Sequence, residues 1–563
     1  MMGASIISAG MLISRFLGLI REHMMLSVFG DSNISGAYNL AFVVPDLFYN
    51  LLAGGAMSAA FIPVFTSYLS RDQHEEAHET GSTIATFLLV AMTVCVAICI
   101  IFAPQLIGTL QLLQPPDHPL SQNDIKLTIS LMRIMCVMLI FTAQSGHFTG
   151  ILNSYKHFLT PVAVWLVYNA SIILGIGVFS KMAIFGGSPQ NPNIHGVAYS
   201  VVLGAIMLAL IQYPVALKFG FKLKFALNFA HEGVRKVLAL FLPVMVSLAL
   251  SQINLLLLPL ILGVHFGLPA VTDIRAANRL VLLPLGLFAI AISTAAFPKL
   301  AEQAAWGEHS AFRTTFAKAM KLIMLLSIPS AMILFVLAEP ITYLLWGGGK
   351  FGKQGVEAAS FVLMLFAWGL LGLGMMQIIN RAFYAMHDTI TPTIVGVGMV
   401  VCNFSLSLYL AYHGAGGMDY GSVAFSTTLT TTVATVILAV LLRRRMAGFE
   451  GRSMLFTLLK TLAAAAVMGV VCYFVAVLLA PMFSGTKLGP AFRWPAPFVP
   501  KEVDITKLAN IRVPRLRMLI EVGMSMFAGM LVYLGMLKAL KVPELTTLTE
   551  RFAGKFRKRP TNV

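Results

Sequence analysis

Residues 6–29 read IISAGMLISRFLGLIREHMMLSVF, an apolar stretch long enough to span a bilayer but interrupted by two arginines. A membrane-spanning helix needs about 20 residues, so Arg15 falls near the middle of the membrane and Arg21 one to two turns beyond it. Each such charge costs roughly 2.5–3.5 kcal/mol at mid-membrane, even on a lenient insertion scale. A helix tolerates that cost only where its charges face a polar cavity, a partner or an anion. The stretch therefore predicts a membrane protein with a site for a negatively charged ligand.

The composition of the whole chain agrees with a polytopic membrane protein. Of its 563 residues, 58% are hydrophobic and 11% are charged, with a mean hydropathy of +0.83. Charged residues make up about a quarter of a typical soluble domain. The net charge of +17 lies mostly in short loops and at the C-terminus, where membrane topology and anionic lipid headgroups explain it. We therefore expect membrane lipids, and no nucleic acid, as partners.

Fourteen apolar stretches are long enough to cross a bilayer. An even number places both chain ends on one side of the membrane. Lysines and arginines concentrate in the loops on that same side, so the positive-inside rule predicts that both termini are cytoplasmic. The basic, proline-rich segment 481–517 departs from this bias; either it is a surface-lying insertion or the last two spans are placed wrongly. The predicted spans are 5–29, 36–60, 83–108, 127–152, 160–180, 196–217, 237–263, 276–298, 318–345, 358–384, 392–412, 420–442, 454–480 and 518–540.

Two short motifs recur along the chain. An Ala-Phe motif that ends in proline closes the second and eighth spans, at Pro63 and Pro298. A Thr-Pro pair opens the fifth and eleventh spans, at Pro161 and Pro392. The two separations are nearly equal, and six spans lie between the members of each pair, so the two halves are predicted to be parallel repeats related by an axis along the membrane normal. The alternative is that both motifs are ordinary punctuation at helix ends.

The predicted fold class is therefore an all-α polytopic membrane protein. It has about 14 transmembrane helices: two parallel six-helix repeats around a central cavity, plus two C-terminal helices. The predicted domains are an N-terminal bundle at 1–225, a C-terminal bundle at 226–450, two extra helices at 451–541 that contain the 481–517 insertion, and a basic cytoplasmic tail at 542–563.

Three arginines are the strongest candidates for ligand binding. Arg15 and Arg21 are six residues apart, about 240° around a helix, so they point to two sides of one broad face. Arg279 lies near the outer end of the eighth span. Guanidinium groups converging on one cavity suit phosphate or pyrophosphate, because they bind its oxygens in a fork-like manner. Glu22 can pair with either neighbouring arginine when no ligand is bound. The alternative is internal salt bridges, or side chains that reach toward lipid headgroups.

The same residues resemble the MurJ (MviN) family of lipid II flippases, which belongs to the multidrug/oligosaccharidyl-lipid/polysaccharide exporter superfamily. The run Ser14-Arg15-Phe16-Leu17-Gly18-Leu19-Ile20-Arg21-Glu22 is the most specific match. The other matching segments are Phe29-Gly30, Pro45-Asp46-Leu47, Ala56-Met57-Ser58-Ala59-Ala60-Phe61-Ile62-Pro63, Asn278-Arg279-Leu280 and Thr391-Pro392.

The resemblance implies a transporter rather than an enzyme, located in the bacterial inner membrane. It implies that lipid II, or a similar polyprenyl-pyrophosphate-linked saccharide, is moved from the cytoplasmic to the outer leaflet by alternating access. The membrane potential alone can drive an anionic headgroup outward, and no cofactor is expected. Other cell-wall synthesis proteins are further partners to consider. The substrate-site residues implied are Arg15, Arg21 and Arg279, with Ser14, Glu22, Asp46 and Asn50 beside them.

This chain departs from the family pattern at several positions, among them Gly36, Gly54 and Leu282, where the family commonly has acidic residues. Asn50 stands where the family commonly has a further arginine of the second span. Some relatives bind sodium through acidic residues, but here only Asn403 matches a ligand, while Leu258 and Ser407 occupy positions of carboxylates. A hard cation needs several oxygen ligands, usually with a carboxylate among them. We therefore expect no metal site, with Asn403 as a weak candidate.

Other functions compete with this interpretation. An exporter of drugs or of another polyprenyl-linked saccharide would share the fold. A membrane enzyme would need acidic or metal-binding residues that converge on one site. A non-transporting scaffold is compatible with the missing arginine. His74 and His78, with glutamates between and beside them, have a spacing that can bind zinc. A solvated charged turn is the preferred interpretation of that segment.

Overall fold

The computed structural model describes residues 2–51, 57–113, 120–254, 258–413, 421–446, 448, 451–484 and 515–544. Within these ranges the regular structure is helical apart from one isolated bridge between Gly348 and Phe351, as the predicted all-α class requires. The first helices are α1 (Met2–Phe29), α2 (Asn33–Ala41), α3 (Val43–Leu51), α4 (Met57–Leu69), α5 (His74–Leu110), α6 (Gln122–Cys136), α7 (Met138–Ser154), α8 (Leu159–Gly177) and α9 (Ile194–Lys218). They are followed by α10 (Glu232–Gln252), α11 (Leu258–Gly263), α12 (Leu268–Pro284), α13 (Ala291–Ala305), α14 (His309–Val336), α15 (Ala338–Trp346), α16 (Lys353–Ala385), α17 (Ile390–Tyr412), α18 (Gly421–Arg445), α19 (Gly451–Ser484) and α20 (Arg515–Ala539).

Eleven helical segments of the described residues are long and apolar enough to cross a membrane. Each of them overlaps a predicted span, although the segment His309–Val336 begins and ends before the predicted 318–345, whose last part falls on α15. The other predicted spans, 5–29, 36–60 and 237–263, lie on α1, on α2 to α4, and on α10 to α11. The protein is therefore a multi-pass membrane protein, although the predicted count of fourteen spans is not established. Most of the insertion at 481–517 lies outside the described residues.

The chain forms two compact units. The first comprises residues 1–275 and 345–355, and the second comprises 276–344 and 356–563. The helix α12 begins in one unit and continues in the other. The predicted domain boundary at 225/226 stays a prediction.

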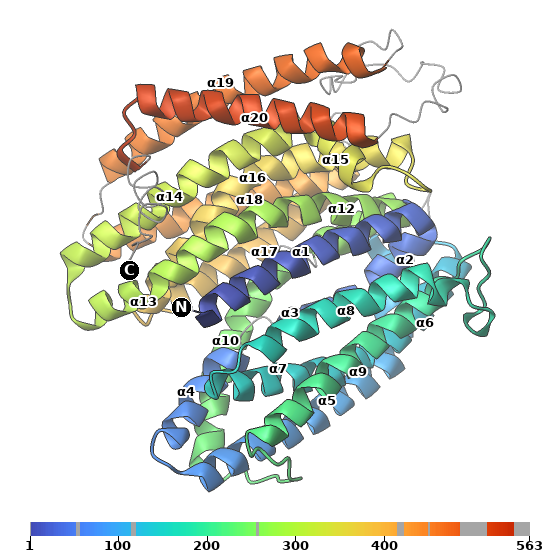
Figure 1. The fold of residues 1–563 in the computed structure, drawn as a ribbon, viewed down its shortest axis with the longest axis vertical. Coiled ribbons are helices and arrows are strands. Elements are labelled where there is room, and N and C mark those ends of the chain that lie inside the picture. Colours follow the sequence, from blue (N-terminus) through green and yellow to red (C-terminus); the bar gives the residue numbers. More distant parts are fainter. Residues whose placement is uncertain are drawn as a thin grey trace, which may run out of the picture. The chain divides into compact units, whose positions relative to one another are not determined.

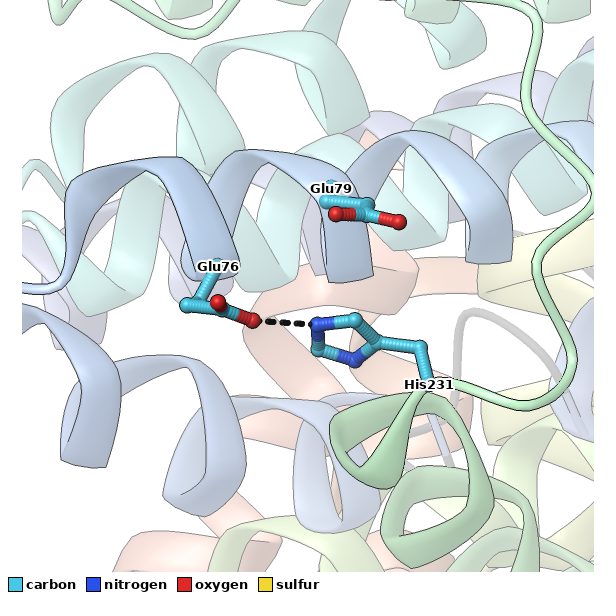
Figure 2. Close-up of side chains that lie close together, drawn as sticks. All are labelled: Glu76, Glu79 and His231. Atoms are coloured by element: carbon cyan, nitrogen blue, oxygen red, sulfur yellow. Dashed lines mark hydrogen bonds and ion pairs between the residues drawn. The ribbon is translucent and has the colours of Figure 1, made fainter.

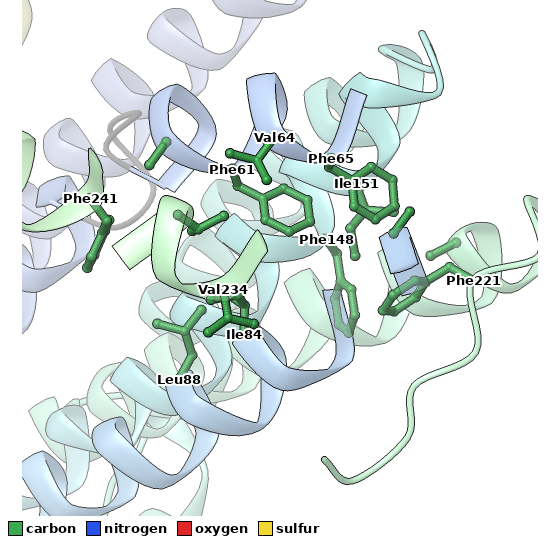
Figure 3. Close-up of a cluster of buried hydrophobic side chains, with 14 of the residues drawn as sticks. Phe61, Val64, Phe65, Ile84, Leu88, Phe148, Ile151, Phe221, Val234 and Phe241 are labelled. Carbon is green, nitrogen blue, oxygen red and sulfur yellow. The ribbon is translucent and has the colours of Figure 1, made fainter. Parts of the chain in front are cut away.

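The core of the first unit is a cluster of aromatic and aliphatic side chains between α4, α5, α7 and α10 (Figure 3). Phe61 and Phe65 of α4 stack at 4.9 Å between ring centroids, and Phe61 meets the edge of His147 at 4.7 Å. His147 is fully buried, and its Nε2 bonds the Gly81 carbonyl of α5 at 2.9 Å. Close packing of this kind fixes where α5 begins, and the side chains discussed below depend on that position.

Two glycines bring the arginine-bearing helix and its neighbours together. The helices α1 and α8 pack side by side, and a Cβ added to Gly10 would lie 1.8 Å from a methyl carbon of Val162 (Figure 1). A Cβ added to Gly36 of α2 would lie 2.1 Å from the Leu268 carbonyl oxygen at the start of α12. Since no larger residue fits at these contacts, α1, α2 and the start of α12 are held where their polar side chains can meet.

In the second unit, α14 packs against α19, which packs against α20 (Figure 1). The Tyr533 hydroxyl of α20 donates to the Leu325 carbonyl at 2.7 Å. The Lys321 ammonium of α14 donates to Ser453 Oγ at 2.7 Å and forms an ion pair with Glu544 at 3.3 Å. The two C-terminal helices predicted from the sequence are therefore tied to the second unit by polar contacts as well as apolar ones.

Turns in the two units repeat the predicted spacing. Lys156 after α7 and His387 after α16 have the same separation as the two Thr-Pro prolines, and both have a left-handed backbone, with φ of 60° and 58°. Asp72 after α4 and Gly307 after α13 have the same separation as the prolines of the Ala-Phe motif, with φ of 61° and 71°. In all four turns the next residue's N–H donates to the carbonyl five residues back, at 2.9–3.0 Å. These are matched Schellman ends, and they support the internal repeat more strongly than the prolines alone.

The helices α12 and α13 are joined by η7, a π-helical segment (Leu285–Ile290) that follows Pro284. Beyond it, Thr294 Oγ1 accepts a hydrogen bond from Arg381 of α16 at 3.0 Å, and the same guanidinium lies 5.7 Å from the ring centroid of Phe297. Pro284 lacks a backbone N–H and so favours such a departure from α-helical bonding.

Candidate functional site

One amide of α8 holds the polar face of α1. Asn169 Oδ1 accepts a hydrogen bond from Arg21 Nη1 at 3.2 Å, and Asn169 Nδ2 donates to Ser14 Oγ at 3.3 Å. Ser14 and Arg21 are seven residues apart, so they lie on the same side of the helix. The structure thus brings two predicted site residues together through Asn169, which sequence reasoning missed. Its only signal was a polar residue in an apolar span.

The acidic partner of Arg21 lies next to it in sequence. Glu22 is buried, and its Oε2 lies 3.7 Å from Arg21 Nη2. That distance is an ion pair but exceeds hydrogen-bonding range. Arg15 is half-buried on α1, about 240° around the helix from Arg21. The predicted pairing of Glu22 with an arginine is present, and it is a loose one.

A second ion pair lies nearby in the first unit. Arg275 Nη2 of α12 lies 3.8 Å from Asp46 Oδ2 in the first turn of α3. The Arg275 guanidinium also lies 5.3 Å from the ring centroid of Phe42. Sequence reasoning missed Arg275, because the eighth span was predicted to begin at residue 276 and the arginine was counted as a loop charge. The helix in fact begins at Leu268.

These two arginines line one small cavity. Its volume is about 20 Å³, and its wall comes from α1, α2, α8 and α12, together with Phe42 between α2 and α3. A single water needs roughly 10–15 Å³, so the cavity has room for one water and none for a phosphate group. Its polar and aromatic lining residues are Arg21, Glu22, Tyr38, Asn39, Phe42 and Arg275.

Neutral side chains in and behind the wall of this cavity hydrogen bond to one another. Thr272 Oγ1 accepts from Asn39 Nδ2 at 3.1 Å and shares a hydrogen bond with Ser35 Oγ at 3.1 Å. The Ser35 hydroxyl also bonds the Gly30 carbonyl at 2.6 Å. The polar residues of α2 and α12 are therefore packed well enough to satisfy one another.

The remaining predicted site residues are not brought into this group. Arg279 is half-buried on the part of α12 that belongs to the second unit. Its convergence with Arg15 and Arg21 therefore stays a prediction. Asn50 lies in α3, but its side chain lies outside the described residues.

Asn403 of α17, the weak cation candidate, lies in a cluster with α18. It is fully buried, its Oδ1 accepts from Ser426 Oγ at 3.0 Å, and its Nδ2 donates to Thr427 Oγ1 at 3.2 Å. Ser407 Oγ also donates to Asn403 Oδ1, at 3.3 Å, and hydrogen bonds to Ser426 Oγ. All four members of this cluster are neutral, and the amide oxygen is already used as an acceptor. The geometry favours a packing role for Asn403.

A further group of side chains lies at the start of α5. The ligand atoms of Glu76, Glu79 and His231 lie within 4.8 Å of one another, and Figure 2 shows His231 directed at Glu76. His231 Nε2 is 2.6 Å from Glu76 Oε2, and His231 Nδ1 accepts the backbone N–H of Gly233 at 3.1 Å. The ring proton therefore lies on Nε2. An imidazole that binds a metal through Nε2 would have to protonate Nδ1, which here faces a donor. The group is thus better suited to a hydrogen-bonded clasp than to a metal site.

The two histidines with zinc-like spacing point to different partners. His74 Nε2 lies 3.1 Å from Asp72 Oδ1, and His78 Nε2 lies 3.3 Å from the Tyr155 hydroxyl. No sequence pattern connects His231 with Glu76 and Glu79, because it lies far along the chain from both glutamates.

Comparisons with known proteins agree on one family. The family model for lipid II flippase MurJ matches residues 25–488. The chain is 27% identical to the lipid II flippase MurJ of Burkholderia cenocepacia over 417 residues, which cover 73% of this chain and 78% of that protein. It is 30% identical to the "Probable lipid II flippase MurJ" of Treponema pallidum over 439 residues, covering 77% and 80% of the two chains.

Solved structures show the same fold. A structure of lipid II flippase MurJ in an inward closed conformation superposes with a TM-score of 0.71 at 21% identity, covering 97% of this chain and 99% of the other. An inward-facing multidrug resistance MATE transporter of the MOP superfamily superposes with a TM-score of 0.63 at 14% identity, covering 79% and 98%. At these identities the likeness concerns the fold alone.

Proposed function

Because this chain belongs to the MurJ family of lipid II flippases, we propose that it carries lipid II, or a similar polyprenyl-pyrophosphate-linked saccharide, across a bacterial inner membrane. The proposed direction is from the cytoplasmic to the outer leaflet, by alternating access. Relatives in this family are named lipid II flippases, and a role without catalysis is part of the proposal. The main support for this proposal is that a chain of this family holds two largely buried arginines, Arg21 and Arg275, each in a long ion pair with a carboxylate.

Arg15, Arg21 and Arg279 are proposed to bind the diphosphate. Guanidinium groups suit it because they offer several donors in one plane to neighbouring phosphate oxygens. Glu22 and Asp46 hold arginines when the headgroup is absent, and their distances of 3.7 Å and 3.8 Å mean that little bonding is lost on exchange. Ser14 supports the site through Asn169. Asn50 is included by its position in α3.

The membrane potential is the proposed driving force. With both termini in the cytoplasm, an anionic headgroup moves outward along an inside-negative potential. The gain is roughly 2.3 kcal/mol per charge per 100 mV. A diphosphate carries enough charge for this term to favour export without a coupling ion. Other cell-wall synthesis proteins are proposed as suppliers or acceptors of the lipid.

A vesicle assay tests the proposal. The purified chain is reconstituted in vesicles that contain fluorescent lipid II, and the labelled lipid reaching the far leaflet is measured with and without an imposed potential. Wild type is expected to translocate lipid II, faster with the potential. Arg15→Ala, Arg21→Ala and Arg279→Ala are each expected to reduce the rate at least about tenfold.

Arg133→Ala is the matched control. Arg133 is exposed on α6, and its Nε donates to the Ile100 carbonyl at 3.1 Å, so its removal should leave transport unchanged. Full activity of all three site variants would remove the arginine mechanism. A wild type that moves a drug cation or another lipid-linked saccharide, but not lipid II, would assign the chain to a different exporter.

A further inference from the structure

We propose that Arg21 and Arg275 form a two-arginine binding site for a phosphate oxyanion, with Asp46 as an internal competitor. Arg275 would thus be a binding residue supplied by α12. The chemistry of the ligand, a phosphate or diphosphate group, is argued from the cavity, and its identity as the headgroup of a lipid-linked saccharide rests on the proposed function.

Arg275 has a buried guanidinium whose hydrogen-bond donors are not all used. Its Nη1 is buried and has no hydrogen-bond partner among the described residues. Its Nη2 reaches Asp46 only at 3.8 Å, beyond hydrogen-bonding distance. A buried donor without an acceptor is costly, and more so when it carries charge. An incoming oxygen acceptor would therefore be bound favourably at this point.

Arg21 lines the same cavity. One of its terminal nitrogens bonds Asn169 at 3.2 Å, while the other lies 3.7 Å from Glu22. The two arginines and Glu22 line the cavity together, whereas Asp46 lies outside its lining. The charged groups of the lining are therefore two cations and one anion, which favours an anionic ligand.

Poor packing does not explain the missing bonds. Thr272, three residues before Arg275 on the same helix, is hydrogen bonded to both Ser35 and Asn39 at 3.1 Å. The face of Phe42 holds the Arg275 guanidinium at 5.3 Å, an orienting contact of the cation–π kind. Phe42 thus fixes the position of the Arg275 guanidinium. Its unused hydrogen-bond donor is confined to this cavity, since the neighbouring polar side chains of Ser35, Asn39 and Thr272 are hydrogen bonded.

The cavity in this conformation is closed. A volume of about 20 Å³ admits a single water-sized atom group. Binding a phosphate therefore requires α1 and α12 to separate slightly and Asp46 to release Arg275. This requirement gives the two side chains opposite predicted effects. Removing the arginine weakens binding, and removing the carboxylate strengthens it.

The experiment measures binding by the purified full chain with two probes. Undecaprenyl pyrophosphate is followed by native mass spectrometry, and inorganic pyrophosphate by calorimetry, since it carries the same oxygens without a lipid tail. For wild type we expect both to bind. Arg275→Met is expected to weaken both by about 30-fold, the lower range for truncating one member of a buried charge pair. Arg275→Lys should fall in between, because an ammonium lacks the planar fork.

Asp46→Asn is the sharpest variant, because it keeps the side-chain volume and should tighten both probes several-fold. Arg133→Met is the matched control and should bind as wild type does. Thermal unfolding of each variant separates lost binding from lost folding; if Arg275→Met unfolds, Arg275→Lys and Asp46→Asn still decide the question.

Equal binding by folded wild type and Arg275→Lys, with no gain in Asp46→Asn, would overturn the inference. So would a wild type that binds neither probe. A wild type that binds pyrophosphate in an Arg275-dependent manner, yet fails to flip lipid II, would leave this site standing and refute the proposed function instead.

Discussion

Two buried polar clusters of this protein differ in how completely their hydrogen bonds are made. Around Arg21 and Arg275, the two ion pairs are 3.7 Å and 3.8 Å long and one buried guanidinium nitrogen has no partner among the described residues. Around Asn403, the amide oxygen and nitrogen both bond hydroxyl groups of α18, at 3.0 Å and 3.2 Å. One cluster is charged and incomplete, and the other is neutral and complete.

The difference separates binding from packing. A neutral network whose members satisfy one another holds two helices at a fixed register and gains nothing from a ligand. Charged groups left partly unsatisfied raise the free energy of the empty protein. A ligand of opposite charge lowers it again. The residues of the first cluster should therefore matter for transport, and those of the second for stability.

The largest expected effect is on transport by a double variant, Arg275→Met combined with Asp46→Leu. Removing the whole ion pair leaves no uncompensated buried charge, so stability should be unchanged or higher by about 1–4 kcal/mol. Transport of lipid II in vesicles should nevertheless fall about 30-fold or more. Thermal unfolding and the vesicle assay measure the two quantities on one preparation. Normal transport in this variant would mean that the Arg275–Asp46 pair has only a structural role. The two polar clusters would then not differ in function.

Asn403→Leu should do the opposite. The substitution removes the amide that bonds Ser426 and Thr427, and a loss of about 1–3 kcal/mol of stability is expected. The rate of transport, measured well below the unfolding temperature, should stay within a factor of about two, a change worth under roughly 0.5 kcal/mol. Sodium dependence provides the cross-check. If sodium raised the unfolding temperature of wild type but not of Asn403→Leu, this cluster would be a cation site.

A smaller effect is expected at the turn between α16 and α17. Asp388 is buried there. Burial by itself raises the pKa of its carboxyl, but the hydrogen bonds from the backbone N–H and hydroxyl of Thr391 and the charge of Arg445, 2.9 Å away, outweigh the effect of burial. The pKa of Asp388 therefore lies below the ordinary value for aspartate. A lowered pKa contributes stability above about pH 4, which is lost as pH falls through the folded-state value. Because Arg445 is half-exposed, we expect less than about 1 kcal/mol.

Thermal unfolding between pH 6 and pH 3 measures this contribution. Asp388→Asn should unfold at a slightly lower temperature than wild type at pH 6, and the gap should close toward pH 3. A gap that is constant across this range would mean that the carboxylate charge plays no part.

The smallest effect is expected at the clasp of α5. Glu76 is half-exposed where it meets His231, so Glu76→Gln should change stability by at most about 1 kcal/mol and leave transport unaltered. Added zinc should leave the unfolding temperature of wild type unchanged. A zinc-dependent rise that disappears in Glu76→Gln would show that the ring can switch its proton and bind a metal.

Much of the fold was predictable because a membrane-spanning helix requires a long run of apolar residues, which can be read directly from the sequence. The helix of Arg15 and Arg21 follows from its apolar run, and the starts of α8 and α17 follow from their Thr-Pro pairs. The ends of helices were less accessible. Arg275 was predicted to be a loop residue because the charged residues in the first turns of α12 interrupt the apolar pattern of the span. Only the packing of α12 against α2 places it inside the protein.

Partners distant in sequence were beyond reach for a different reason. Asn169 and His231 carry no local pattern of their own. Their roles arise from contacts across 148 and 155 residues, to Arg21 and Glu76. A single sequence holds no record of such contacts, whereas the charged residues they meet are visible at once.

The π-helical segment η7 has a geometric consequence for the second unit. Each π turn holds about one residue more than an α turn, and one residue corresponds to about 100° of rotation. The π-helical segment therefore offsets the direction in which Arg279 points, before η7, from that of Thr294 and Phe297 after it, which both contact Arg381. Shortening η7 by one residue would rotate one set of side chains away by about a quarter turn, so the length of this segment helps to set which surfaces α12 and α13 present.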